Sequence, residues 1–585
     1  MTSILVYLVL FVPIASQSQS CLPEGITFTT QSQIDSFQIN YPGCTEIEGD
    51  MIVFGEEILS LDSLYSIHKF QGRLIIDSCI SLKNLGGLHN VDIVSNDLIL
   101  RDNVSLNSLN GLNSLHYVGG DISVVNSSII NLAGLEALDS IGESLIIQNN
   151  DSIISFLGID NLTNISGSLR IYSNNRISEI IGFNSLESIG VCLLVSENDS
   201  LISLDGLEQL SIIESCLTIE KNPLLTNITA LGNVDSLSGS VEINENQSLT
   251  SLIGLEGINS LHELSIRNCP NLVNLNGLNN LYSVESNVLI INDDALTNLT
   301  GLNHLSRING FLSIQHNYML YNLEGLDSLA EVGGTMAIKY NDNLQDFVGV
   351  ENLKEIGGIS FLYNASLVSL NGIQIESNTI SGINIMHNDN LTSISGLDSI
   401  SDIGYNLHIW GNNSLTSLSG LNGVKNAPQL FIIENNSLTN LSGIDSIAAS
   451  SFFSVRIMDN SSLSVCSVQS ICEYLAASSG AVEIHDNATG CNSRQEVEES
   501  CTVGIPKAIN GWYVSIFPNP TSSEITISGV EGIIDEISIY NKLGQKVIHE
   551  DKAGNTIDVS WLSQGLYIVE VLWDGHRVRE KLIVQ

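Results

Sequence analysis

The chain has 585 residues, of which 43% are hydrophobic, and its 64 acidic and 21 basic residues give a formal net charge of −43 at pH 7. A surface this acidic repels nucleic acid and anionic lipid headgroups, which excludes both as partners. The apolar content suffices for a continuous core, and we expect the charge to keep the protein soluble and monomeric.

Residues 1–20 have the composition of a secretory signal peptide. The apolar run from Ile4 to Val12 is too short to span a bilayer, and Ala15 and Ser16 suit cleavage by signal peptidase. The basic residue that usually precedes such a run is missing, which leaves an N-terminal membrane anchor as the alternative. No later stretch holds about 18 uninterrupted apolar residues, so we expect the mature chain to have no transmembrane segment.

A unit of 24 residues then recurs from about Gly49 to Val465, in about eighteen copies. Residues 97–120 show its frame, L-x-I-x-x-N-x-x-L-x-x-L-x-G-L-x-x-L-x-x-I. A fixed period in this range indicates a solenoid, in which each coil buries its apolar edge against its neighbours. The L-x-I alternation predicts a short strand in every coil, and stacked coils would join these strands in a parallel sheet. The predicted fold class is therefore all-β.

An asparagine follows the strand in most copies. A buried amide can satisfy backbone N–H and C=O groups at a turn and also bond the amide of the next coil, so we interpret these residues as a structural ladder rather than a binding site. Asn126 and Asn364 are included in this interpretation, and Gly55, Cys79 and Cys269 are among the exceptions. The main predicted members are Asn103, Asn150, Asn174, Asn198, Asn222, Asn246, Asn317, Asn341, Asn388, Asn412, Asn435 and Asn460.

The ten cysteines of an exported chain suggest disulfides. Six lie outside the repeats, where terminal coils need caps, and we predict them to be disulfide-bonded. Cys192 and Cys216 are one period apart and should stack on adjacent coils, either bonded or as free thiols. Cys79 and Cys269 lie too many coils apart to bond each other. The six predicted cap cysteines are Cys21, Cys44, Cys466, Cys472, Cys491 and Cys501.

The repeat frame, with its N-terminal cysteine cap and Cys-rich exit, resembles receptor L-domain repeats, a right-handed relative of leucine-rich repeats. The resemblance covers about residues 21–501, and the spacing N-x-x-L, where leucine-rich repeats have N-x-L, favours a right-handed parallel β-helix-like solenoid over a helix-backed horseshoe. It implies a scaffold that binds a ligand or partner, and it carries over no binding residue. The expected segments are a cap at 21–48, repeats at 49–465, a second cap at 466–501 and a linker at 502–512.

Outward strand positions become aromatic and apolar in the last third of the repeats. Exposed apolar patches often mark partner sites, and aromatic side chains suit sugar stacking or protein anchoring. Strand propensity, or cover by the C-terminal cap, is the alternative explanation. The candidate partner-binding stripe consists of Tyr340, Tyr363, His387, His408, Trp410, Phe431 and Arg456.

Residues 513–585 break the period and read as short alternating strands between turns, which predicts a small β-sandwich. They closely resemble the type A C-terminal sorting domain of the type IX secretion system. The resemblance implies a Bacteroidota-type bacterium, contact with the secretion machinery, export across the outer membrane, and removal of the tail with release or surface attachment. A generic adhesive β-sandwich is the alternative. The matching motifs include Pro518, Asn519, Pro520, Gly544, Gly565, Tyr567 and Lys581.

The sequence contains no HExxH, GxSxG or Walker motif, and no histidine pair at metal-ligand spacing. We therefore expect no catalytic residue, metal or cofactor. The predicted function is a non-enzymatic binding or adhesion scaffold, extracellular or on the outer-membrane surface, for an unknown extracellular protein or glycan. The alternatives are a polysaccharide-acting β-helix enzyme, which would need converging carboxylates, and a purely structural surface-layer component.

Overall fold

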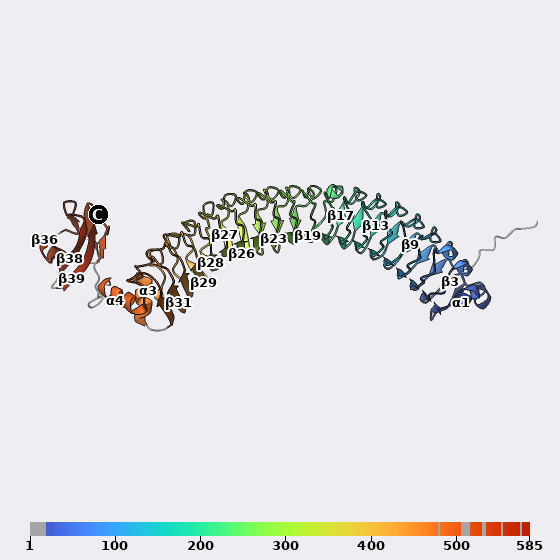
Figure 1. Ribbon diagram of the computed structural model, residues 1–585, viewed down its shortest axis with the longest axis horizontal. Helices are drawn as coiled ribbons and strands as arrows, with labels where there is room; N and C mark the ends of the chain where they lie inside the picture. The colour runs from blue at the N-terminus through green and yellow to red at the C-terminus, as the bar shows by residue number, and fades with distance from the viewer. Residues whose placement is uncertain (1–18, 478–479, 505–514, 529–533, 552–553, 574–575) are drawn as a thin grey trace, which may run out of the picture.

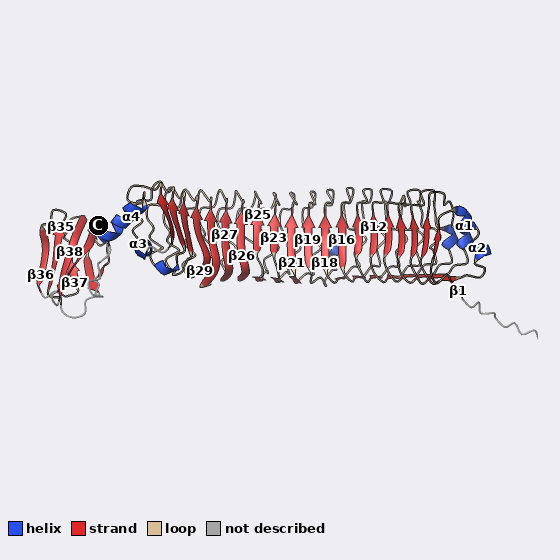
Figure 2. Cartoon of the chain, turned by 90° about the horizontal axis from the view of Figure 1, so that it is seen from below, coloured by secondary structure: helices blue, strands red, loops and turns tan. Residues whose placement is uncertain are grey.

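A computed structural model describes residues 19–477, 480–504, 515–528, 534–551, 554–573 and 576–585. The repeats form a parallel β-solenoid of about 19 turns that bends into a long arch (Figure 1). A broad sheet lies along the concave side of the arch, and irregular loops form its convex side (Figures 1 and 2). The signal-peptide prediction lies almost entirely outside the described residues, as does most of the predicted linker.

The broad sheet contains one strand from each coil, paired in parallel with the strand one period earlier. Leu98, for example, pairs with Leu74 on one side and Ile122 on the other. In-register pairing places apolar residues above one another, so every coil extends the same core. The strands are β2 (Ile26–Phe28), β4 (Met51–Phe54), β6 (Leu74–Asp77), β8 (Leu98–Arg101), β10 (Ile122–Val125), β12 (Leu145–Gln148), β14 (Leu169–Tyr172), β16 (Cys192–Ser196), β18 (Cys216–Glu220), β19 (Ser240–Asn244), β21 (Glu263–Arg267), β23 (Val288–Ile291), β25 (Leu312–Gln315), β26 (Glu331–Lys339), β27 (Glu355–Leu362), β28 (Thr379–Met386), β29 (Asp402–Trp410), β30 (Gln429–Ile433), β31 (Ser454–Met458) and β32 (Ala481–His485).

A narrow parallel sheet of mostly two-residue strands forms a second wall, interrupted after β17 and resumed at β20. From β26 onward the two walls merge, because single strands of up to nine residues run through both. The narrow strands are β1 (Ser20–Cys21), β3 (Glu46–Ile47), β5 (Lys69–Phe70), β7 (Ile93–Val94), β9 (Tyr117–Val118), β11 (Ser140–Ile141), β13 (Asn164–Ile165), β15 (Ser188–Ile189), β17 (Ile212–Ile213), β20 (Ser260–Leu261), β22 (Ser283–Val284) and β24 (Arg307–Ile308).

One continuous core of Leu, Ile, Val and Phe fills the solenoid. Its corners come so close to the neighbouring coil that some positions accept only glycine. Gly111 has φ of +117°, and a Cβ built there would lie 1.9 Å from the carbonyl oxygen of Leu85. The glycine of the repeat frame is therefore required both by its backbone conformation and by this close approach.

The twelve main predicted asparagines and Asn364 lie inside the solenoid, fully buried and linked from coil to coil. The Asn198 Nδ2 donates to the carbonyl oxygens of Ile171 at 3.0 Å and Ser196 at 2.9 Å, and its Oδ1 accepts from the backbone N–H of Asn174 at 3.0 Å. Each amide thus bonds backbone groups that the turn leaves outside the sheet. The ladder continues into the C-terminal cap, where the Asn487 Oδ1 accepts from the backbone N–H of Asn460 at 3.0 Å.

The assignment of Asn126 to this ladder is wrong. Ser127 occupies the buried position and donates its backbone N–H to Asn150 Oδ1 at 2.9 Å, whereas Asn126 is exposed and donates to Asp102 Oδ1. The strand register, which pairs Val125 with Gln148, decides which residue turns inward. The presence of an asparagine just after the strand does not.

Disulfides close both ends, and a further one lies within the repeats. The N-terminal cap has two short helices and the C-terminal cap two longer ones. The bonded pairs are Cys21–Cys44, Cys192–Cys216, Cys466–Cys491 and Cys472–Cys501. The helices are α1 (Gln31–Asp35), α2 (Phe37–Asn40), α3 (Gln469–Ala477) and α4 (Arg494–Gly504), and single 3₁₀ turns are η1 (Asp62–Leu64), η2 (Gly86–Leu88), η3 (Thr229–Leu231) and η4 (Ala449–Ser451).

The C-terminal segment folds as two antiparallel sheets around one small core. Asn519 joins its first motif to its last strand, because its Nδ2 donates to the Lys581 carbonyl oxygen at 2.6 Å and its Oδ1 accepts from the Ile583 N–H at 2.8 Å. Gly544, with φ of +75°, forms a turn. The strands are β33 (Ser515–Phe517), β34 (Glu524–Ser528), β35 (Glu536–Asn541), β36 (Lys546–Asp551), β37 (Thr556–Asp558), β38 (Gly565–Trp573) and β39 (His576–Val584).

Two further residues of the predicted sorting motif lie at the start of β38. Gly565 is its first residue, and the hydroxyl of the buried Tyr567 donates to the Ser563 carbonyl oxygen at 2.8 Å. No helix in the described ranges combines the length and apolar character that a membrane crossing requires.

Candidate functional site on the concave face

The concave face differs from the rest of the solenoid in charge. Residues 505–585 hold seven of the basic and ten of the acidic residues, which leaves 14 basic and 54 acidic residues before them. Each broad strand from β4 to β32 turns two side chains outward, at the positions that follow the buried L and I of the frame. Five of these outward residues are basic, namely Arg101, Arg170, Arg267, Lys339 and Arg456, and four are acidic, namely Asp77, Glu220, Glu242 and Glu483.

The outward strand positions therefore carry a net charge of +1 on a solenoid whose remaining surface is strongly negative. Many are apolar, among them the partly exposed Leu362, Met386, Trp410 and Phe431. A nearly neutral apolar face on an otherwise acidic protein is where an uncharged or apolar partner surface can approach without strong repulsion or desolvation cost.

The residue after each broad strand forms a second row along one edge of this face, and most of its side chains are at least partly exposed. Almost all these residues have φ between +51° and +61°, the left-handed region that non-glycine residues rarely adopt. This turn reverses the side-chain alternation, so that the next residue, the ladder asparagine, points inward. We call these residues the edge row; in chain order it includes Asp102, Asn126, Asn149, Ser173, Glu197, Lys221, Glu245, Asn268, Asn292, His316, Tyr340, Tyr363, His387, Gly411, Glu434, Asp459 and Asp486.

Four rings of the edge row stack into an aromatic ladder. Ring centroids are separated by 4.5 Å from His316 to Tyr340, 4.9 Å from Tyr340 to Tyr363 and 4.6 Å from Tyr363 to His387, with interplanar angles of 4°, 4° and 16°. This spacing is close to the separation of adjacent strands, so the fold itself aligns the rings. His316 extends the predicted stripe by one coil; its signal was the same position in the repeat.

The aromatic ladder is exposed by its ring edges rather than its faces. Tyr340 is 36% exposed and Tyr363 is 41% exposed, but each of their faces covers a neighbouring ring. Contrary to the expectation from the sequence, the Tyr340 and Tyr363 rings therefore offer no free flat face for sugar stacking. What they offer a partner is a row of edges with phenol hydroxyls and imidazole nitrogens.

The other predicted stripe residues form a parallel row on the strands themselves. His408 stacks on Phe431 with centroids 4.3 Å apart, and the Arg456 guanidinium lies 5.0 Å above the other side of the Phe431 ring. Arg456 also pairs with Glu483, its Nε lying 3.1 Å from the Glu483 Oε2. Burial lowers the pKa of His408, which favours the neutral imidazole.

Trp410 joins the two rows. Its ring lies 5.8 Å from that of His387 at an angle of 44°, and it follows His408 by two residues on β29. The Trp410 Nε1 and His408 Nε2 atoms are buried, and neither has a hydrogen-bond partner within the described residues. Unpaired buried polar atoms are uncommon and cost free energy. Strand β21 carries two more, the Ser265 Oγ and the Arg267 Nε.

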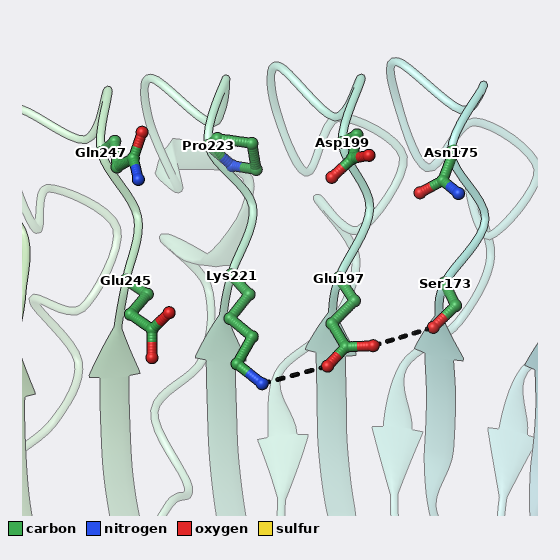
Figure 3. A pocket seen from close by; sticks show the side chains of 8 residues that line it. All are labelled: Ser173, Asn175, Glu197, Asp199, Lys221, Pro223, Glu245 and Gln247. Carbon is green, nitrogen blue, oxygen red and sulfur yellow. Dashed lines mark hydrogen bonds and ion pairs between the residues drawn. The ribbon is translucent and has the colours of Figure 1, made fainter.

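A groove of about 410 Å³ follows the edge row nearer the middle of the arch (Figure 3). It lies between the edge row and the residues two positions later in four consecutive coils. Its charged groups largely satisfy one another, since Lys221 Nζ lies 3.1 Å from Glu197 Oε1 and the Ser173 hydroxyl donates to Glu197 Oε2 at 3.0 Å. The lining residues are Ser173, Asn175, Glu197, Asp199, Lys221, Pro223, Glu245 and Gln247.

Three buried titratable groups in the described part of the solenoid occupy ladder positions in its core. Cys79 and Cys269 are free thiols inside the core, and burial raises the pKa of these thiols to about 11 and about 12, which opposes formation of the reactive thiolate. Asp293 replaces an asparagine of the ladder, and burial raises the pKa of its carboxyl group to about 7. All three residues are ladder positions without access to a substrate.

A comparison with known protein families identifies the C-terminal segment. Residues 515–585 match the family described as the secretion system C-terminal sorting domain. This segment carries the motifs noted in the sequence, and it marks the protein as one exported by the type IX secretion system to the cell surface or the extracellular space. A search of curated proteins finds no match to the chain.

Proposed function

We propose that the solenoid is a non-enzymatic binding or adhesion scaffold, displayed outside the cell after export, that docks an extracellular partner on the last third of its concave face. The observation that carries this proposal is the charge pattern. The outward strand positions have a net charge of +1, whereas residues 1–504 together have a net charge of −40. Repulsion from the remaining surface would limit contacts elsewhere on the molecule.

The ordered aromatic and apolar residues of β27 to β31 support the position of the docking surface. Aromatic anchors and arginine are the side chains that most often dominate binding energies. Here Trp410, Phe431 and Arg456 lie on consecutive strands and are held by stacking and by an ion pair, so little side-chain entropy would be lost on binding.

The experiment compares the full-length protein with its Trp410→Ala variant. Both are incubated with washed cells of a bacterium that carries the secretion system and with an array of extracellular proteins and glycans, and the retained protein is measured. Tyr405→Ala is the matched control, because Tyr405 is an aromatic residue on the same strand and is 73% exposed.

We expect Trp410→Ala to lower retention about tenfold or more, the effect of truncating an anchor residue, and Tyr405→Ala to change it little. Equal retention by a folded Trp410→Ala protein would contradict the proposed docking surface. Cleavage of an arrayed glycan by the purified protein would instead favour the polysaccharide-acting alternative, and the absence of binding to any surface would favour a structural surface-layer component.

A further inference from the structure

The narrow sheet carries a pocket of about 540 Å³ that spans three consecutive coils. Strands β22, β24 and the start of β26 form its base, where Ser283 pairs with Arg307 and Arg307 pairs with Glu331. None of the residues that line this pocket belongs to the edge row or to the outward positions of the broad strands. Its volume lies in the range of pockets that hold small ligands, so this wall offers a site separate from the docking surface proposed above.

The pocket is open because one large side chain is followed by two small ones. Tyr282, Ser306 and Ala330 occupy equivalent positions in the three coils, and all three line the pocket. Backbone bonds align them, since the Ser306 N–H donates to the Tyr282 carbonyl oxygen and the Ala330 N–H donates to that of Ser306, each at 2.9 Å. The small side chains of Ser306 and Ala330 therefore leave a trough beside the tyrosine.

Tyr282 differs from the tyrosines of the aromatic ladder in having an uncovered ring. It is 62% exposed, and within the described residues no aromatic ring or cation stacks on it. Tyr340 and Tyr363, by contrast, are each covered by neighbouring rings. Tyr282 thus keeps a flat apolar face, the kind of surface on which the C–H groups of a sugar ring can stack.

Arg307 and Glu331 place fixed polar groups in the same pocket. The Arg307 Nη2 lies 2.5 Å from the Glu331 Oε2, and the two side chains are 55% and 27% exposed. The guanidinium has further N–H donors and the carboxylate further lone pairs, so the pair presents donors and acceptors side by side. Because the ion pair already orients both groups, little side-chain entropy would be lost when they bond adjacent hydroxyl groups of a ligand.

We propose that this pocket binds one pyranose ring of an uncharged glycan. The ring stacks on Tyr282, lies over the trough and directs adjacent hydroxyls to Arg307 and Glu331. Glu285 also lines the pocket, and residues 1–504 have a net charge of −40, so an anionic sugar is repelled whereas a neutral one is not. The inference adds a second binding site and is independent of the docking surface on the concave face.

Saturation-transfer difference NMR on the full-length protein tests this site. The probes are methyl β-D-galactopyranoside, methyl β-D-glucopyranoside and methyl α-D-mannopyranoside, which differ in the orientation of their hydroxyls, and D-glucuronate is the charged control. The variants are Tyr282→Ala, Tyr282→Phe and Arg307→Gln. Tyr117→Ala is the matched control, because Tyr117 is an exposed tyrosine of the same narrow sheet, on β9, and lies outside the pocket.

We expect saturable binding of at least one of the three pyranosides and none of glucuronate. Tyr282→Ala should weaken binding about tenfold, on the scale of a lost aromatic contact, whereas Tyr282→Phe, which keeps the ring, should stay within about twofold of the parent. Arg307→Gln should weaken binding about fivefold, because a neutral donor replaces a charged one. The Arg307 ion pair is exposed, so its loss should leave the protein folded.

Three results would each overturn the proposed sugar site: no saturable signal from any of the three pyranosides, equal affinities of the Tyr282→Ala and Tyr117→Ala variants, or tighter binding of glucuronate than of the neutral sugars. These results are distinct from failure of the proposed function. Retention on a partner surface depends there on Trp410, whereas sugar binding at this pocket depends on Tyr282, and a folded Trp410→Ala protein should bind the pyranoside as the parent does.

Discussion

Asp293 offers the sharpest test of how the buried ladder is held together. In a ladder asparagine such as Asn317, the Nδ2 donates to the carbonyl oxygen of Ile290 at 3.0 Å. The Asp293 Oδ1 accepts from the Cys269 N–H at 2.8 Å, but its Oδ2 has no partner within the described residues. A carboxylate cannot donate to the carbonyl that its position faces. We therefore expect Asp293→Asn to stabilise the protein, and more so at higher pH.

The magnitude follows from the pKa of Asp293, which burial raises from 3.8 to about 7. The folded protein holds this proton over a pH range in which the unfolded chain has released it, so stability falls as pH rises from about 4 to about 7. About three pKa units correspond to about 4 kcal/mol. The unfolding entropy of a solenoid of this length is about 1 kcal/mol/K, so Asp293→Asn should raise Tm at pH 8 by about 4 °C. The rise in Tm is larger if fewer coils unfold together, because the entropy of unfolding is then smaller.

Thermal unfolding of both proteins, followed by circular dichroism at pH 4 and pH 8, measures this effect. The stabilisation by Asp293→Asn should be small at pH 4, where the folded carboxyl group is protonated and the unfolded one is only about half ionised, and should approach its full value at pH 8. Asp294→Asn is the matched control, because Asp294 is exposed on the same turn. A pH-independent difference, or a variant less stable than the parent at pH 8, would refute the reasoning.

Two further substitutions test the coil itself by thermal unfolding. Asn198→Ala leaves the Ile171 carbonyl and the Asn174 N–H without a partner, and should lower the free energy of unfolding by about 3 kcal/mol. An equal loss of stability in the exposed Asn175→Ala control would rule out a special role for the ladder. Glu245 has φ of +55°, a left-handed conformation that strains a non-glycine residue, so Glu245→Gly should leave stability unchanged or raise it by up to about 1 kcal/mol. Glu220→Gly, within β18, should instead lower stability by about 1 kcal/mol. Equal destabilisation of both would contradict the assigned strain.

The fold was largely predictable because a solenoid is built from contacts between adjacent repeats. The period, the inward leucines and isoleucines and a parallel all-β solenoid with an antiparallel C-terminal unit were all readable from the repeat frame, and the structure confirms that fold class. The candidate site was only partly predictable. The sequence indicated which residues lie in the stripe. It did not indicate that the Tyr340 and Tyr363 rings stack on each other, or that the Arg456 guanidinium lies over the Phe431 ring.

The sequence by itself determined the properties that depend on one coil and its neighbours: the length of the repeat, the buried face of each strand and the export signal in the tail. The tertiary structure alone decided the properties that depend on the exact turn and on the merging of many coils. The left-handed turn placed Ser127 rather than Asn126 in the core, and the register brought Cys192 and Cys216 together in a disulfide. The stacked coils gathered nearly neutral outward strand positions on the concave side of an otherwise acidic solenoid. Periodicity sets which side chains recur, whereas backbone conformation and register set which way each one points.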